Sequence, residues 1–428
     1  MQKKFTVAIL GVGARGFTYG NLMYASENFE ITALCDYNKA QIEKANHIFN
    51  VDAKDIFYDT EAFFEKKRAD VLVIATHDKF HVPQCIKALR LGYDVLLEKP
   101  VSDSTKEIEE LLKTQEETGK KVVVCHVLRY SAPFIKLSQL LKAGEIGNLI
   151  AIDAMERVRY WHQAQAYVRL QSEVNDIAHP TILAKCCHDL DYIQHYACAK
   201  CETVSSIGNL RFFRKENAPE GSAERCLACT YMDTCTYSAK RIYIDRWNHL
   251  GRPAFAWPFN KISLKNPNTE EDLYNGLKTS VLGKCAFKCN VESNPHVVDH
   301  QMVQMQFKNG VTAQLRMLFT DDPEGRRVTL FGTQGELVLD GRAATIEVRR
   351  YGKQPEIIKT KDLLEGLKFG YGHAGGDEGM INDLYDILTG KKQDYTSLSE
   401  SLESHLIGIK AEESRLNGGI TLKIHENA

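Results

Sequence analysis

A glycine-rich turn directly after the first strand-like segment limits the possible folds more than any other feature of this sequence. Phe5 to Leu10 form a short apolar run, and Gly11-Val12-Gly13-Ala14-Arg15-Gly16 follows at once. Glycines at this spacing permit a tight turn, close approach of a pyrophosphate to the backbone, and close packing of a helix on the strand. The next residues are compatible with a helix, whose amino terminus favours anions. We predict that a dinucleotide binds at Gly11, Gly13, Ala14, Arg15 and Gly16; glycines that serve only packing are the alternative.

An aspartate at the end of the second apolar run strengthens this prediction. Ile31 to Cys35 lead into Asp36, which stands 20 residues after Gly16. A carboxylate there accepts hydrogen bonds from a ribose diol and repels a 2′-phosphate, and Tyr37 follows it where an arginine would welcome that phosphate. NAD is therefore favoured over NADP as the cofactor.

Residues 1–127 alternate short apolar runs with amphipathic segments, which is typical of a doubly wound parallel sheet. The expected strands are Phe5–Leu10, Ile31–Cys35, Val71–Ala75, Asp94–Leu97 and Val122–His126. The expected helices are Ala40–Phe49, Pro83–Leu91 and Thr105–Thr118. We predict an α/β fold class with an amino-terminal Rossmann NAD-binding domain over residues 1–127.

The hydrophobic period changes to two after about Asn148, so residues 128–428 are predicted to form an α+β domain for substrate binding and oligomerisation. In residues 302–317, apolar residues alternate with polar ones on both sides of the two-residue turn Asn309-Gly310, as in a β-hairpin. One face of that sheet must be covered by helices or by another subunit. Closing helices are expected over Gly379–Leu388 and Ser399–Leu416.

Polar residues follow the fourth and fifth expected strands, where ligands bind in open parallel sheets. Ala75-Thr76-His77-Asp78-Lys79-Phe80-His81 comes first, and Glu98-Lys99-Pro100 ends the next strand. An ordinary polar loop is the alternative for the first segment. We predict that the cofactor is also contacted by Asp36, Thr76, His77, His81, Glu98 and Lys99.

These motifs together resemble the Gfo/Idh/MocA family of oxidoreductases. The resemblance extends through Arg129-Tyr130-Ser131-Ala132-Pro133, Gly144-Glu145-Ile146-Gly147, Cys187-His188-Asp189-Leu190-Asp191 and residues 331–337, and it covers nearly the whole chain outside residues 211–294. It implies a carboxy-terminal domain with a large open, mainly antiparallel sheet, commonly buried in homodimers or homotetramers. It also implies hydride exchange between a nicotinamide and a sugar, cyclitol or related carbinol. Lys99 and His188 match the family's catalytic lysine and histidine.

The chemistry needs a donor to the carbinol oxygen and a base for its proton. Lys99 suits the first role and His188 the second, with Asp191 available to orient the imidazole ring. Two departures from the family pattern stand out. His77 follows Thr76 where many members have proline, and Ala184 stands four residues before His188 where many place an acidic side chain. Lys185, beside that gap, is a second catalytic candidate.

Aromatic and charged side chains in residues 157–176 suit a polyhydroxylated ligand, because sugar faces stack on rings and hydroxyls need paired donors. A loop that only packs on the sheet is the alternative. The predicted substrate-binding residues are Tyr160, His162, Arg169, His188 and His373, the last from a glycine-rich turn over residues 372–377.

The stretch 211–294 has little periodicity and carries Cys226-x2-Cys229-x5-Cys235 followed by Cys285-x3-Cys289. Thiolates gathered from two segments are typical of structural zinc, and an iron–sulfur cluster needs four thiolates as well. Free thiols and disulfides remain alternatives. The selected ligands are Cys226, Cys229, Cys235 and Cys289.

The charge balance excludes some partners. Lys plus Arg number 54 against 56 Asp plus Glu, which argues against a nucleic-acid or anionic-membrane surface, and no apolar run approaches the ~20 residues of a membrane span. We predict a soluble cytoplasmic NAD(P)-dependent dehydrogenase acting on CH–OH in a sugar, glycoside or cyclitol. The alternative is an NAD-assisted glycoside-cleaving enzyme with transient oxidation, elimination and no net redox change; a third is a nicotinamide-binding sensor.

Overall fold

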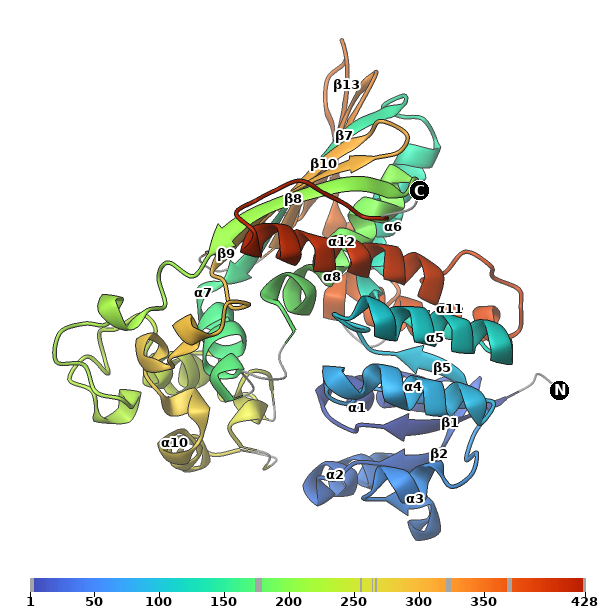
Figure 1. Cartoon of the computed structure of the whole chain (residues 1–428). Coiled ribbons are helices and arrows are strands. Elements are labelled where there is room, and N and C mark those ends of the chain that lie inside the picture. Colours follow the sequence, from blue (N-terminus) through green and yellow to red (C-terminus); the bar gives the residue numbers. More distant parts are fainter. Residues whose placement is uncertain are drawn as a thin grey trace.

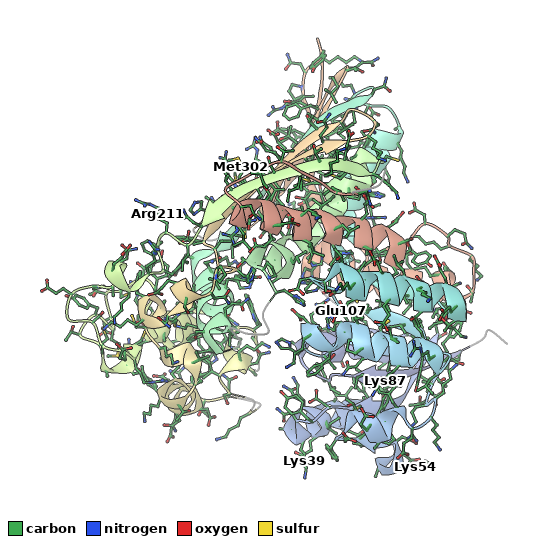
Figure 2. The ribbon with its side chains drawn as sticks, viewed as in Figure 1. Lys39, Lys54, Lys87, Glu107, Arg211 and Met302 are labelled. Atoms are coloured by element: carbon green, nitrogen blue, oxygen red, sulfur yellow. The ribbon has the colours of Figure 1, made fainter. Side chains whose placement is uncertain are left out.

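The computed structural model consists of two β-sheets and an insert, which is the stretch 211–294. It describes residues 4–173, 179–254, 256–263, 265, 268–320, 325–367 and 372–425. In Figure 1 the amino-terminal sheet lies at the lower right, the second sheet at the top, and the insert at the left. The chain leaves strand β8 near Arg211 for the insert and has returned in strand β9 by Met302, as the labels in Figure 2 show.

The first sheet has six parallel strands in the order β3-β2-β1-β4-β5-β6. They are β1 Phe5–Leu10, β2 Phe29–Cys35, β3 Ile56–Phe57, β4 Val71–Ile74, β5 Asp94–Leu97 and β6 Val122–Val124. The helices between them are α1 Ala14–Tyr24, α2 Lys39–Phe49, α3 Thr60–Phe64, α4 His81–Arg90 and α5 Thr105–Thr118. The predicted Rossmann fold is confirmed, with element bounds within three residues of those expected.

Local sequence explains where these helices begin and end. The Asn38 side chain accepts from the Ala40 amide at the start of α2, and the Ser104 hydroxyl accepts from the Glu107 amide at the start of α5. Side chains of this type satisfy amides that have no partner within the helix. Helix α5 ends at Gly119 in the left-handed conformation, which glycine adopts without strain.

The core of the first sheet is completed from the far end of the chain. Helix α11 (Gly376–Leu388) buries Met380, Ile381 and Leu384 with apolar side chains of β1 and α1. On the other face, Leu398 and Leu402 of α12 (Leu398–Leu416) join the core formed with α4 and α5. The division into residues 1–127 and 128–428 stays a prediction, since the core of the first sheet draws on both ranges.

The second sheet has nine strands in the order β14-β13-β12-β11-β7-β10-β9-β8-β15, antiparallel except for the β7–β10 pair. The strands are β7 Leu149–Arg159, β8 Cys201–Asn209, β9 His300–Phe307, β10 Thr312–Thr320, β11 Gly325–Gly332, β12 Gly335–Asp340, β13 Thr345–Arg350, β14 Glu356–Lys359 and β15 Leu422–Lys423. The predicted hairpin is confirmed, with Met305 opposite Ala313 and Val303 opposite Leu315. The fold class is therefore the predicted one.

One face of this sheet packs against α6 (Ala132–Lys142), α8 (Thr181–Ala197) and α12. The other face carries polar side chains, among them Thr203, Ser205, Gln304, Gln306, Thr312 and Gln314. Within the described ranges, none of the helices combines the length and apolar character that crossing a bilayer requires.

The insert has a hydrophobic core of its own. Phe213, Trp247 and Leu273 pack there with Trp161 and Val168, which come from the segment after β7. Its regular elements are short, among them α9 Arg246–His249, α10 Glu270–Thr279 and π-helical Lys240–Asp245. The segment after β7 adds α7 Tyr160–His162, which continues into π-helical Gln163–Arg169. The core contributes folding energy without any metal, so a metal is not needed to explain why this aperiodic stretch folds.

Candidate active site

A cavity of about 200 Å³ lies where strands β4 and β5 end and α8 passes over them. Seven of the predicted site residues line this cavity: Arg15, Thr76, His81, Glu98, Lys99, His188 and His373. Ala75, Asp78, Cys125 and Val127 complete the wall. The cavity is thus built at the carboxyl edge of the parallel sheet, where such folds bind ligands.

The glycine-rich turn has the geometry that its sequence predicts. Gly11 adopts φ +86°, and a Cβ there would stand 2.5 Å from the Ala75 carbonyl oxygen. A Cβ on Gly16 would stand 2.0 Å from the Gly11 carbonyl oxygen. At Gly13 nothing in the described chain lies within 4 Å of such a Cβ, and this residue begins α1 with no side-chain cap. A phosphate can therefore approach the backbone at Gly13 and at the start of α1, where Ala14 lies.

Asp36 links the end of β2 to the glycine turn. Its carboxylate accepts hydrogen bonds from the Val12 and Asn38 amides, each at 2.8 Å. A carboxylate has about four acceptor sites, so both oxygens keep capacity for the hydroxyls of a ribose. Tyr37 beside it is 89% exposed and offers no cation to a 2′-phosphate. These contacts fit NAD.

A buried ion network supports Lys99. Glu98 accepts from Arg15 Nε at 2.8 Å, from the Tyr19 hydroxyl at 2.7 Å and from the Lys99 amide at 2.9 Å. Arg15 also pairs with Asp377 of α11 at 2.6 Å. Burial raises the pKa of Glu98, but the charges of Arg15 and Lys99 lower it further, so the net pKa lies below its usual value.

The network uses Glu98 and the Arg15 side chain as supports; both also line the cavity, and their contact with the cofactor stays a prediction. Their hydrogen bonds hold the peptide that carries Lys99, and the Lys99 ammonium donates to the Ala184 carbonyl oxygen at 3.5 Å. Where many family members have an acidic side chain, a backbone carbonyl of α8 therefore contacts the lysine.

His81 holds two strand ends together. Its Nδ1 lies 2.7 Å from the Pro100 carbonyl oxygen and its Nε2 lies 3.2 Å from the Thr76 carbonyl oxygen. The Thr76 hydroxyl donates to Gln84 at 2.6 Å. His77, the remaining predicted member of this loop, does not line the cavity.

His188 faces the cavity as a buried neutral imidazole. Burial, followed by the charges of Lys99 and His126, lowers the pKa of His188 well below 6.5. Its Nδ1 is buried and has no hydrogen-bond partner in the described part of the chain. An unprotonated ring in this position can accept a proton.

Asp191 does not orient the His188 ring, contrary to the sequence-based expectation. Its carboxylate points to Arg129, at 3.6 Å, and to His126 Nε2, at 4.0 Å. The Asp191 carboxylate does not line the cavity and is directed toward His126 and Arg129, just after the end of β6. Burial raises the pKa of Asp191 to about 6, although Arg129 opposes that shift.

Lys185, the second catalytic candidate, does not line the cavity. It pairs at 3.0 Å with buried Glu156 of β7, which also pairs with Arg326 at 2.9 Å. Arg326 in turn binds Asp189 through two hydrogen bonds. This position joins α8 to the sheet and does not favour catalysis.

The predicted substrate residues separate into two groups. His188 and His373 line the cavity, and His373 Nδ1 lies 3.0 Å from Asp377 Oδ2. The rings of Tyr160 and His162 pack edge-on against rings of the insert, His162 with its ring centre 4.9 Å from that of Trp257. Residues 174–176 of the predicted segment lie outside the described residues.

Arg169 was predicted wrongly as a substrate ligand. It is fully buried, and its guanidinium donates to the Lys284 carbonyl at 2.8 Å and to the Tyr237 carbonyl at 2.7 Å. Its sequence neighbours gave no sign of this, because the residues it contacts are 68 and 115 positions away.

The cysteine cluster needs one correction. Cys226, Cys229, Cys235 and Cys285 line a common void, whereas Cys289 does not. Cys289 turns its thiol back to the Cys285 carbonyl oxygen, at 3.3 Å. Within the described part of the chain, no three His, Cys, Asp or Glu side chains form a group that could hold a metal ion.

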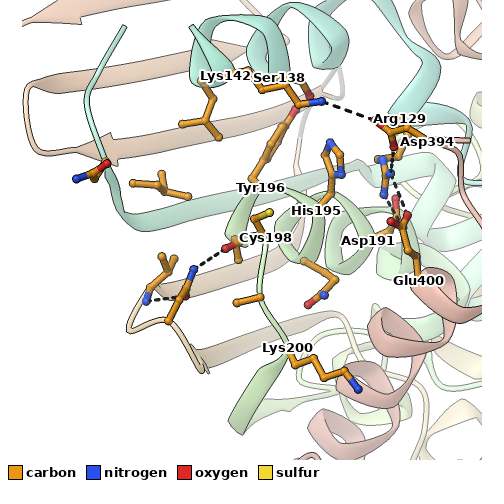
Figure 3. Close-up of a pocket in the computed structure, with 18 of the residues that line it drawn as sticks. Arg129, Ser138, Lys142, Asp191, His195, Tyr196, Cys198, Lys200, Asp394 and Glu400 are labelled. Carbon is orange, nitrogen blue, oxygen red and sulfur yellow. Dashed lines mark hydrogen bonds and ion pairs between the residues drawn. The ribbon is translucent and has the colours of Figure 1, made fainter. Parts of the chain in front are cut away.

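A larger cleft of about 800 Å³ lies on the other side of α8 (Figure 3). Arg129, Asp191 and Glu400 meet on its wall, with Arg129 donating to Glu400 at 3.2 Å. Asp191 therefore stands between this cleft and His126, whose ring centre lies 5.8 Å from that of His188.

Three residues of the site were missed in the sequence. Asp377 lies four residues after His373 in the glycine-rich run, so the same motif held the signal for it. Tyr19 and His126 sit in apolar runs that predict only core packing, and no sequence pattern pairs them with Glu98 or His188.

The parallel sheet with its glycine turn, a lysine at the end of β5 and a histidine on α8 that faces it across the cavity define the class of NAD-binding oxidoreductases. Residues 5–126 match the Gfo/Idh/MocA profile, described as an oxidoreductase family with an NAD-binding Rossmann fold. Residues 5–126 are therefore similar to the NAD-binding Rossmann domain of the Gfo/Idh/MocA family, as the motifs predicted.

Relatives extend the similarity over the rest of the chain. YteT of Bacillus subtilis (strain 168), an oxidoreductase by name, is 22% identical over 386 residues, or 85% of this chain and 86% of that protein. Glycosyl hydrolase family 109 protein 1 of Shewanella sp. (strain MR-4) is 25% identical over 185 residues, which is 41% of this chain and 38% of that protein. The scyllo-inositol dehydrogenase of Lactobacillus casei, solved with NAD(H) and scyllo-inositol, shares the fold with a TM-score of 0.66 at 14% identity, covering 99% of both chains.

Proposed function

We propose that this protein oxidises a secondary alcohol of a sugar, glycoside or cyclitol with NAD. The single observation that supports this most strongly is the cavity that joins Lys99 and His188 at the edge of the nucleotide-binding sheet. NAD bound across that sheet would supply the hydride acceptor. The scyllo-inositol ligand of the Lactobacillus casei enzyme supports a polyhydroxylated substrate class.

Different side chains interact with the carbinol oxygen and accept the hydroxyl proton. The Lys99 ammonium donates to the carbinol oxygen and stabilises negative charge as it develops there. The neutral His188 ring accepts the hydroxyl proton. Arg15 and Asp377 act through Glu98, because they fix the peptide from which Lys99 projects.

The proton has a route out that does not cross the substrate. His126 lies between His188 and Asp191, and Asp191 also lines the outer cleft. The distances are longer than direct hydrogen bonds, so a water must bridge each step. On this proposal, release of the proton from His188 would run through His126 and Asp191 to the outer cleft.

A second function keeps the same residues. In an NAD-assisted glycoside-cleaving enzyme, transient oxidation acidifies the neighbouring C–H, the aglycone leaves, and the hydride returns. The similarity to a family 109 glycosyl hydrolase favours it.

One experiment separates these functions. The purified protein is given NAD and a panel of cyclitols, sugars and aryl glycosides, and NADH absorbance and aglycone release are followed separately. Growth of NADH supports the dehydrogenase, and aglycone release without NADH supports the glycoside-cleaving enzyme. If protein that binds NAD gives neither NADH nor released aglycone with any member of the panel, both proposed functions are contradicted.

We also propose that the polar face of the second sheet forms a homodimer or homotetramer interface. Ile207, 60% exposed, shares the outward face of β8 with Thr203 and Ser205. Light scattering should give a mass two or four times 48.4 kDa, and Ile207→Lys should shift it toward the monomer.

A further inference from the structure

The candidate active site contains one imidazole more than the oxidation of an alcohol requires. His188 and His373 both line the cavity together with Lys99, and the ring centres of the two histidines lie 6.1 Å apart. Alcohol oxidation uses one donor to the carbinol oxygen and one base for the hydroxyl proton. Lys99 and His188 fill these roles in the proposed function, so His373 has no proton to move in that reaction.

A buried carboxylate orients the His373 ring. Its Nδ1 lies 3.0 Å from Asp377 Oδ2. Burial raises the pKa of Asp377, but the hydrogen bond from His373 and the charge of Arg15 lower it further, so the net pKa lies well below its usual value. An ionised carboxylate only accepts hydrogen bonds, so Nδ1 carries the ring proton and Nε2 keeps a lone pair. His373 therefore has the nitrogen of a base in a fixed ring.

The backbone around His373 is held in an unusual conformation. His373 has φ +49° and Ala374 has φ +52°, and side chains other than glycine rarely adopt such values. Backbone strain of this kind persists only where the surrounding structure imposes it, and it is concentrated at functional sites.

The same ion network supports both sides of the cavity. Asp377 pairs with Arg15 at 2.6 Å, and Arg15 pairs at 2.8 Å with Glu98, which holds the Lys99 peptide. The imidazole of His373 and the ammonium of Lys99 are thus fixed relative to each other. This precision suits proton transfer, which requires atoms within hydrogen-bond reach.

We propose that His373 is a second proton-transfer group, which removes and returns the proton on the carbon next to the oxidised carbinol. The inference rests on the proposed function, because this proton becomes acidic only after the carbinol has become a ketone. The C–H bond breaks and its proton goes to Nε2 of His373. The electron pair forms the C=C bond of an enolate, and the ketone oxygen takes the negative charge, which the Lys99 ammonium stabilises.

The same step cleaves a substrate that has a leaving oxygen on the next carbon. The C=O bond forms again, the electron pair moves into a new C=C bond, and the bond to the leaving oxygen breaks. His373 then gives its proton to that oxygen. Addition of water by the reverse movements restores the saturated carbon, so no net oxidation occurs. His373 therefore favours a glycoside as substrate over a cyclitol without a leaving group.

Deuterium exchange tests this role. The full chain is incubated in D₂O with NAD and the panel of cyclitols, sugars and p-nitrophenyl glycosides, and NMR locates deuterium in the recovered substrate. Wild type should place deuterium on the carbon next to the carbinol, above the level of a protein-free sample. His373→Gln should lower this exchange and aglycone release at least about 10²-fold, while single-turnover NADH formation falls by less than about tenfold.

His425→Gln is the matched control for this variant. His425 also pairs with a carboxylate, Glu403 at 2.9 Å, but it does not line the cavity. The variant should keep both the exchange and NADH formation at wild-type rates. Circular dichroism and NAD titration establish that each variant folds and binds the cofactor.

The possible failures can be told apart. Undiminished exchange in His373→Gln, or wild-type protein that forms NADH without any exchange, would overturn the inference and leave the proposed function in place. Equal loss of NADH formation and exchange in His373→Gln would assign His373 to the oxidation step and also overturn it. The absence of NADH, aglycone and deuterium with every member of the panel would contradict the proposed function and this inference with it.

Discussion

At the scale of the residue, the site depends on a lysine supported by buried ions. Glu98, Arg15 and Asp377 form a network of ion pairs. Burying any one of these charges without its partners would cost free energy, because a buried charge needs an opposite charge beside it. The consequence is a fixed peptide at Lys99, so catalytic position is determined by side chains from α1 and α11 as well as by β5.

Replacing Lys99 should abolish turnover without removing the cofactor. For Lys99→Met we expect kcat to fall by about 10²- to 10⁴-fold, the usual contribution of a positioned proton donor, while NAD affinity changes by less than about tenfold. Steady-state kinetics and calorimetry measure the two quantities. Lys185→Met is the control, because Lys185 pairs with Glu156 away from the cavity; an equal loss of kcat in this variant would contradict the assignment.

His188 should act as a base over the whole neutral range. Because burial and Lys99 lower its pKa well below 6.5, the ring is neutral above pH 6.5 and becomes protonated only at lower pH. We expect kcat/KM to show no loss between pH 8 and pH 6.5 from this group, and His188→Gln to lower kcat by about 10²- to 10⁴-fold. An acid limb in kcat/KM with a midpoint at or above pH 6.5 would contradict this role.

At the scale of the element, the turn between β1 and α1 contains one glycine that the fold requires and another that cofactor binding requires. Gly11 needs a positive φ and has no room for a Cβ, whereas Gly13 faces open space. Their sequence spacing is the same signal, yet the two glycines serve different purposes.

Alanine at the two positions should therefore have opposite effects. Gly13→Ala should keep the melting temperature within about 2 °C and weaken NAD binding at least about tenfold, since the methyl group occupies the phosphate approach. Gly11→Ala should lower stability by about 1–3 kcal/mol or more through strain and the clash with Ala75. Thermal melts and NAD titrations check both; unchanged NAD affinity in Gly13→Ala would place the phosphates elsewhere.

Sequence periodicity was sufficient for elements whose stability is local. The strands of the first sheet and the β9–β10 hairpin follow from alternation and turn residues, because neighbouring residues determine both. It was insufficient for α11, which the sequence predicted as a closing helix but which packs on a sheet formed more than 250 residues earlier. Such packing depends on the tertiary fold, and one helical period is compatible with many partners.

At the scale of the whole molecule, the same limit explains the errors within the site. Lys99, His188 and His373 follow strand ends or match motifs, so the sequence predicted them together. Arg169 and Lys185 looked similar in type and position, but each found a buried partner across the fold. Residue type and local sequence identify candidate site residues, but tertiary contacts determine which of them line the cavity.

Buried histidines should make the folded chain sensitive to acid. Burial lowers the pKa of His126 and of His405 to about 3, and that of His188 well below 6.5. Between those values and 6.5 the unfolded chain binds more protons, so stability present above pH 6.5 is lost as the pH falls, by about 1.4 kcal/mol per group and pH unit. Asp191, raised to about 6, opposes this below pH 6.

The loss from these four groups should be on the order of 3 kcal/mol per pH unit between pH 6 and pH 4.5. Urea unfolding across this range measures it. His126→Phe should flatten the slope by one histidine's share, because both ring nitrogens of His126 are buried and have no hydrogen-bond partner in the described chain. Equal stability at pH 7 and pH 5 would show that these imidazoles are not held neutral.

The most direct test of the central claim is calorimetric titration of cofactor-stripped protein with NAD and NADP. If a dinucleotide lies along the first sheet with its ribose at Asp36, the titration should give one NAD site per chain and NADP at least about tenfold weaker. No binding heat from either dinucleotide, in protein that melts cooperatively, would contradict the account.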